Sequence, residues 1–125
     1  MTKRLGFIKA DKIRKTKEYL KLFKEGQQYY YRAIKIYILP RPNCQNNRLG
    51  VIVSRKVKGA VIRNRYKRLV REFFRLNQAK FKNKVELVII ITGKIEPVDY
   101  DIIKKRIIIL LNKINLYSKE EKELK

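Results

Sequence analysis

The chain has 125 residues, with 33 Lys and Arg against 11 Asp and Glu, so its formal net charge is +22. This length predicts one domain, and a hydrophobic content of 45% is enough for a packed core. So large an excess of positive charge destabilises a compact state by self-repulsion unless a polyanion is the normal partner. Nucleic acid is therefore the first candidate partner.

Composition also excludes several classes of protein. The sequence has no His, and Cys44 is its one cysteine. It therefore cannot form an intramolecular disulfide, a zinc finger, or a Ser/His/Asp or Cys/His catalytic arrangement. No apolar run approaches the roughly 18 residues of a membrane span, and the N-terminus lacks the apolar segment of a secretory signal. We expect a cytoplasmic protein that does not contact a membrane.

The first half of the chain predicts a helix followed by two strands. Residues 1–14 are basic and weakly patterned, and we expect them to form an N-terminal arm. Residues 16–25 repeat apolar side chains at helical spacing, and a glycine follows them. Residues 29–39 alternate isoleucine with other side chains, which predicts a strand with one core face and one aromatic, cationic face. After a turn at 43–47, residues 48–54 predict a second strand that pairs with the first as a hairpin.

The second half predicts a helix, a strand and a helix. Residues 60–78 form a long amphipathic stretch. Residues 85–92 are almost continuously apolar and β-branched, which favours a strand inside a sheet rather than at its edge. Apolar residues recur at helical spacing from the N-cap Asp99 to about residue 116, and 117–125 form a charged tail. The element order predicts a single α+β domain over 15–116, a sandwich of helices against a small sheet.

A helical wheel divides the helix at 60–78 into two faces. At 100° per residue, one side holds an apolar set, namely Ile62, Tyr66, Leu69, Val70, Phe73 and Leu76. The other side holds Arg68, Arg71 and Arg75 within about 40° of Asn64. An ordinary solvated face mixes charges of both signs, whereas this one has Glu72 as its single acid. The stripe therefore favours a phosphate-rich surface, which Arg contacts in a planar, bidentate way.

The aromatic side chains of the first helix and first strand form a separate feature. Tyr37 and Lys35 share the exposed face of the predicted strand, and Tyr19 and Phe23 lie one turn apart on the helix. These side chains are able to line a cleft between helix and sheet in which an unpaired nucleic-acid strand stacks. Alternatively, Tyr19 and Phe23 are ordinary core residues.

Residues 50–75 resemble the signature of the bacterial ribonuclease P protein subunit. Its hallmark is an Arg-Asn-Arg core, here at 63–65, followed by Lys-Arg at 67–68 and Arg-Glu at 71–72. The segments 14–26, 48–50 and 85–91 resemble other parts of the same family, so the resemblance covers roughly residues 12–115.

This resemblance implies a small α/β sandwich with an unusual left-handed βαβ crossover, against the usual right-handed preference. It also implies that the protein pairs with a large catalytic RNA, and that the complex removes the 5′ leader from precursor tRNA using Mg²⁺. The chemistry would reside in the RNA, so no catalytic residue and no small-molecule substrate are expected on the protein. Whether the protein itself holds a metal ion stays open.

The resemblance and the wheel together assign two groups of binding residues. Those expected to contact the RNA subunit are Arg55, Lys56, Arg63, Asn64, Arg65, Lys67, Arg68, Arg71 and Arg75. Those expected to contact the leader of precursor tRNA are Tyr19, Phe23, Lys35 and Tyr37.

Three features depart from the family pattern. Lys58-Gly59 stands where the family usually has Gly-Asn, and Tyr19 stands where it usually has Phe. Arg63 falls near about 260° on the wheel, toward the apolar flank. Either the helix begins later than Ala60, or the Arg63 side chain extends around its side.

Other functions remain possible from the residues alone. A ribosomal or general RNA-binding protein would share the charge and the fold, and a DNA-binding module would place a helix in a duplex groove. A protein nuclease is disfavoured because two-metal cleavage needs clustered carboxylates, and acids are sparse here.

Overall fold

The computed structural model describes residues 12–13, 15–42, 46–96 and 99–114. They form one sheet, three α-helices and a short 3₁₀ helix. In chain order the elements are α1 (Thr16–Glu25), β1 (Gln27–Tyr31), β2 (Ile34–Pro40), β3 (Arg48–Val53), α2 (Ala60–Asn77), the 3₁₀ helix η2 (Gln78–Lys80), β4 (Val85–Ile91) and α3 (Tyr100–Leu111). The predicted α+β class and element types are confirmed.

The sheet has the strand order β1-β2-β4-β3. β4 is antiparallel to β2 and parallel to β3, and α2 connects β3 to β4 as the crossover of a βαβ unit. The predicted hairpin between the strands at 29–39 and 48–54 is therefore wrong. β4, which is almost entirely apolar, lies inside the sheet between β2 and β3, as its sequence predicts. The left hand of the crossover stays a prediction from the resemblance.

The segment predicted as one strand at 29–39 is two strands joined by a tight turn. Tyr31 pairs with Ile34, so the two residues between them form the turn of a β1-β2 hairpin. Arg32 and Ala33 both have positive φ angles, 40° and 69°. Two successive positive φ angles are typical of a type I′ turn, which fits the twist of the strands. The prediction missed it because neither residue is the Gly or Asn that usually marks such a turn.

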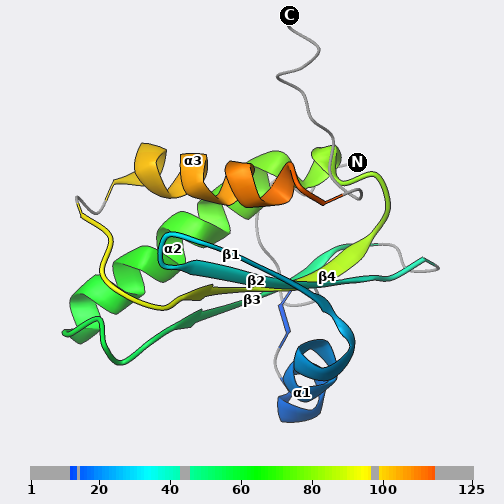
Figure 1. Cartoon of the computed structure of the whole chain (residues 1–125), viewed down its shortest axis with the longest axis horizontal. Coiled ribbons are helices and arrows are strands. Elements are labelled where there is room, and N and C mark those ends of the chain that lie inside the picture. Colours follow the sequence, from blue (N-terminus) through cyan, green and yellow to red (C-terminus); the bar gives the residue numbers. More distant parts are fainter. Residues whose placement is uncertain (1–11, 14, 43–45, 97–98, 115–125) are drawn as a thin grey trace, which may run out of the picture.

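Helices cover the two faces of the sheet unequally (Figure 1). α2 and α3 lie together on one face, where the largest buried side chains are Tyr66, Phe73 and Phe74. α1 lies on the opposite face, near one end of the sheet, and its one fully buried residue is Leu22. The face that carries α1 is therefore only partly covered by the residues that the structure describes.

Two details of the helices differ from the predictions. The buried side of α2 is rotated relative to the predicted one, because Phe74 and Asn77 are buried whereas Leu76 is 56% exposed. The Phe74 ring lies 6.2 Å, centroid to centroid, from the ring of Phe81 beyond the end of the helix. α3 ends at Leu111 rather than near residue 116: the Asn112 N–H donates to the Ile108 carbonyl, and a turn follows through residue 114. Residues 115 and 116 lie outside the described residues.

The described part of the predicted N-terminal arm packs on the domain. Lys12 forms a parallel bridge with Leu49, and the Ile13 N–H donates to the Leu49 carbonyl at 3.0 Å. Ile13 is buried beside Leu22. The remaining residues of the predicted arm, 1–11 and 14, and the predicted tail lie outside the described residues.

The buried Tyr66 joins α2 to the segment after β4, and substitution tests how much its hydroxyl contributes to stability. The Tyr66 hydroxyl donates to the Ile95 carbonyl and accepts from the Ile95 N–H, both at 2.8 Å. Tyr66→Phe leaves both groups of Ile95 without this partner, so we expect the free energy of unfolding in urea to fall by about 1–3 kcal/mol. Tyr29→Phe removes an exposed hydroxyl bond to Gln27 and should change it by less than about 0.5 kcal/mol. Equal effects of the two substitutions would contradict this role.

Candidate nucleic-acid interface

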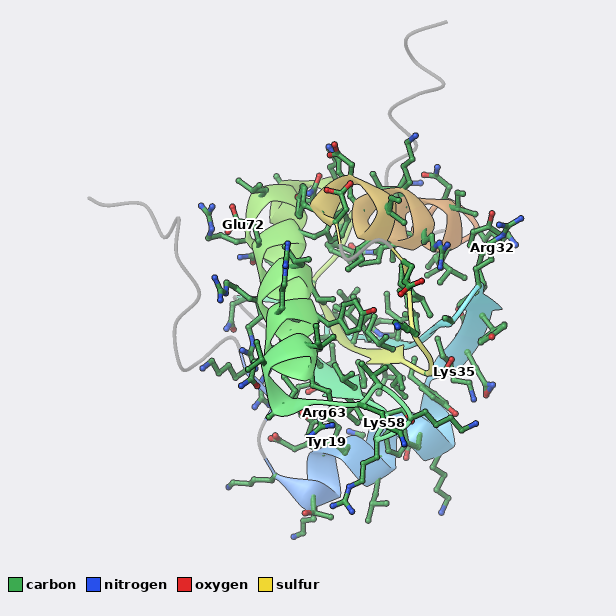
Figure 2. All side chains as sticks on the ribbon, turned by 90° about the vertical axis from the view of Figure 1, so that its left-hand side faces the viewer. Tyr19, Arg32, Lys35, Lys58, Arg63 and Glu72 are labelled. Carbon is green, nitrogen blue, oxygen red and sulfur yellow. The ribbon has the colours of Figure 1, made fainter. Side chains whose placement is uncertain are left out.

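The outer side of α2 carries the predicted cationic stripe, which we call the α2 basic face: Asn64, Arg65, Lys67, Arg68, Arg71 and Arg75. Asn64, Arg65 and Arg68 are exposed, and the others are partly buried. Figure 2 shows side chains of α2 projecting away from the sheet. Arg75 forms an ion pair with Glu72 one turn away, so charge at the C-terminal end of the face is partly neutralised. The first three turns hold the largest uncompensated charge.

The loop before α2 presents the next two predicted residues, Arg55 and Lys56, both of which are exposed. The Lys56 N–H donates to the Ser54 hydroxyl at 3.1 Å, which orders the turn. Gly59 then adopts a φ of 94°, a conformation that only glycine takes readily. The Lys58-Gly59 pair thus supplies the glycine that this turn needs directly before the helix.

Arg63 extends back along the start of α2, which resolves its odd position on the wheel. The helix begins at Ala60, and the Arg63 guanidinium donates to the Val57 carbonyl at 2.9 Å. Its side chain is partly buried and ties the loop at 54–59 to the helix (Figure 2). Arg63 therefore supports the basic loop as well as adding charge to it.

The four predicted leader residues lie together on the partly covered face of the sheet, and we call them the aromatic cluster: Tyr19, Phe23, Lys35 and Tyr37. The Phe23 ring centroid is 4.9 Å from that of Tyr37, edge to face, and 6.3 Å from that of Tyr19. The Lys35 ammonium lies 5.8 Å from the centroid of the Tyr37 ring. Phe23 is 36% exposed and Tyr19 is only partly buried, so neither is an ordinary core residue.

Tyr19 lies against the sheet because Gly50 has no side chain. A Cβ atom added at Gly50 would lie 2.7 Å from the Tyr19 ring and hydroxyl. The hydroxyl donates to the Ile13 carbonyl at 3.1 Å. A phenol is protonated at neutral pH, and burial raises the pKa of the Tyr19 phenol further above its ordinary value.

An arginine of the α2 basic face acts electrostatically on Tyr19 of the aromatic cluster. The positive charge of Arg71 lies close enough to the Tyr19 phenol to lower its pKa, against the larger effect of burial. By contrast, Lys35 lies on the far side of the molecule from Glu72 and α2 (Figure 2). The Tyr19 end of the aromatic cluster is therefore the end nearer to α2.

An ion pair that the sequence analysis missed fixes α1 in place. The Arg48 guanidinium donates to both carboxylate oxygens of Glu18, at 2.9 and 3.0 Å, and to the Lys12 carbonyl at 2.8 Å. Glu86 lies 3.6 Å from the same guanidinium. No local pattern links residues thirty positions apart, so only the fold reveals this anchor.

Three of the acidic side chains in the described ranges pair with arginine. No group of three or more Cys, Asp or Glu side chains that could hold a metal ion occurs there. Glu18, Glu72 and Glu86 each form an ion pair with arginine. Within the same ranges, no helix is both long and apolar enough to cross a membrane.

Comparison with known proteins agrees with this geometry. The family model described as "Ribonuclease P" matches residues 7–115. A "Ribonuclease P protein component" from Clostridium botulinum is 41% identical over 112 residues, which cover 89% of this chain and 100% of the relative. The chain belongs to the ribonuclease P protein family.

Solved structures of the family share the fold. The ribonuclease P protein from Thermotoga maritima superposes with a TM-score of 0.72 at 29% identity, over 83% of this chain and 97% of that one. The protein from Staphylococcus aureus superposes with a TM-score of 0.75 at 24% identity, over 88% and 100% of the two chains. The family and the small α+β fold implied by residues 50–75 are thus confirmed.

The close contact between Gly50 and Tyr19 gives a test of the site's construction. Gly50→Ala forces the Tyr19 ring from its position, so we expect the free energy of unfolding to fall by about 1–3 kcal/mol in urea denaturation. Gly93→Ala is the matched control, because no atom lies within 4 Å of its added Cβ. In the Tyr19→Ala background the effect of Gly50→Ala should largely disappear. Additive losses in the double variant would show that the ring is not what Gly50 accommodates.

Proposed function

We propose that this protein is the protein subunit of ribonuclease P, which binds a catalytic RNA and the 5′ leader of precursor tRNA and promotes removal of that leader. The observation that carries the proposal is the presence of two different surfaces, one cationic and one aromatic, on one small domain. The α2 basic face suits a folded RNA rich in phosphate, and the aromatic cluster suits unpaired bases. The RNA and the precursor are both present in the cytoplasm, where we expect the complex to act.

The contact with the RNA subunit is electrostatic in this proposal. Arg55, Lys56 and Arg65 are exposed and lie on or next to the first turns of α2. Arg68 and Arg71 continue the same face, and each guanidinium is able to pair with a phosphate in a bidentate way. Binding releases counterions from the RNA, so affinity should depend steeply on salt.

The contact with the leader uses stacking in this proposal. Tyr37 and Phe23 present partly exposed rings, and a base stacked on an aromatic side chain contributes about 1–3 kcal/mol regardless of its sequence. Lys35 beside Tyr37 supplies a positive charge for a backbone phosphate. Such a site favours substrate, which has a leader, over mature tRNA, which has none.

The proposal assigns catalysis to the RNA and Mg²⁺ to its phosphates. The described acids do not fit a protein metal site, because three of them are engaged by arginine and none form a cluster. The role of the protein is to dock on the RNA and to hold the leader, and no step of the cleavage is assigned to its side chains.

Reconstitution tests the proposal directly. Precursor tRNA is incubated at low Mg²⁺ with a bacterial ribonuclease P RNA, with the protein, or with both. We expect correct 5′ ends to form much faster with both than with RNA alone, and no cleavage by protein alone. If the protein binds the RNA from its own source tightly but does not stimulate cleavage, a ribosomal or general RNA-binding role replaces this proposal.

Salt dependence tests the α2 basic face. Arg68→Ala should weaken binding to the RNA subunit and reduce the slope of log affinity against log salt by about one unit, for one lost phosphate contact. Lys105→Ala removes one exposed charge from the outer side of α3 and should leave the slope unchanged. If the two substitutions change the slope equally, the RNA does not dock specifically on α2.

A further inference from the structure

An exposed tyrosine of β1 lies outside every role assigned above. Tyr30 is 57% exposed, which is unusual for so large an aromatic side chain in a sheet. It pairs directly with Lys35 of β2 in the antiparallel register. Opposite residues in such a pair share a face of the sheet, so Tyr30 lies on the same face as Lys35.

The same face carries the aromatic cluster. Lys35 and Tyr37 are two residues apart in β2 and therefore point the same way. The side chains next to Tyr30 lie on the other face of the sheet, since Tyr29 and Tyr31 pack against the main core under α2 and α3. Tyr30 thus extends the row of side chains from Tyr37 past Lys35 to the edge of the sheet.

The Tyr30 ring is held in place by its own hairpin. Its hydroxyl accepts a hydrogen bond from the Ala33 N–H at 3.3 Å. Ala33 lies in the turn, where its positive φ angle of 69° directs the backbone. A ring fixed in this way loses little conformational freedom when a base stacks on it.

We propose that Tyr30 is an additional stacking residue, which binds a leader nucleotide farther from the cleavage site than the one on Tyr37. This inference rests on the proposed function, since it extends the same leader site from β2 to β1. The ligand is single-stranded RNA of any sequence, because every base offers a face for stacking. Lys35, between the two rings, neutralises the intervening phosphate.

The direction of the leader follows from the position of α2. In the proposed function the catalytic RNA docks on the α2 basic face, and Figure 2 shows Tyr19 nearer to α2 than Lys35 is. The Tyr19 end of the row is therefore nearer to the catalytic RNA, and Lys35 lies on the side away from α2 (Figure 2). Nucleotides reach Tyr30 only when the leader is long enough to pass Tyr37.

The test measures the affinity of the reconstituted holoenzyme for precursor tRNAs whose leaders are lengthened one nucleotide at a time. For the unmodified protein, affinity should rise with length and then level off. The affinity of the Tyr30→Ala holoenzyme should equal that of the unmodified one for short leaders and level off at a shorter leader length. For long leaders its affinity should be lower by about 5- to 100-fold. Tyr30→Phe retains the ring and should retain most of that affinity.

Controls separate this inference from the proposed function. Ile109→Ala removes a partly exposed apolar side chain from α3 and should change nothing. Tyr37→Ala should reduce the affinity that a leader adds, relative to mature tRNA, at every leader length. If Tyr37→Ala does so but Tyr30→Ala retains full affinity for long leaders, the role of Tyr30 is overturned and the leader site stands.

Two further outcomes have distinct meanings. If neither substitution alters the dependence on leader length, the leader site itself is overturned. If Tyr30→Ala weakens binding equally at all lengths, including mature tRNA, Tyr30 does not stack on the distal leader and the inference fails.

Discussion

The Arg48 guanidinium holds α1 on the sheet, and the position of the aromatic cluster depends on it. Leu22 is the one residue of α1 that is fully buried, so apolar packing alone gives this ten-residue helix a weak attachment. Arg48 adds a bidentate bond to Glu18 and a bond to the chain before α1. Charge-assisted pairs of this geometry are stronger than neutral hydrogen bonds and restrict orientation. Fixing Glu18 fixes the helix that carries Tyr19 and, one turn later, Phe23.

The edge strand β3 contacts both α1, which carries Tyr19 and Phe23, and α2, which carries the basic face. β3 is an edge strand, with Arg48 and Gly50 facing α1 on one side and α2 crossing behind it on the other. Gly50 lets the Tyr19 ring approach the backbone of this strand, and the charge of Arg71 on α2 acts on the Tyr19 phenol. A side chain at Gly50 would displace the Tyr19 ring. This edge strand therefore connects α1 and α2, the two helices whose side chains the proposed function uses.

Local patterns predicted most elements, and long-range pairing limited the rest. The period of α2 and the apolar run of β4 are strong enough to place both from sequence. The sequence did not predict the tight turn at Arg32-Ala33. This turn changes the face of the sheet on which the residues before it lie. In one continuous strand, Tyr30 falls in phase with the core residue Ile34, whereas the hairpin pairs it with Lys35. A single strand over these residues therefore gives no indication that Tyr30 is exposed.

Acidic and basic side chains are distributed differently over the described part of the domain. Glu18 and Glu86 are partly buried and pair with arginines that join α1, β3 and β4. Acids thus serve cohesion, and Arg65 and Arg68 are left exposed on α2 among further cations. Because like charges on that helix repel each other, the folded domain carries an electrostatic strain that a phosphate surface relieves. This repulsion is a physical argument for the polyanionic partner that the proposed function assigns to the protein.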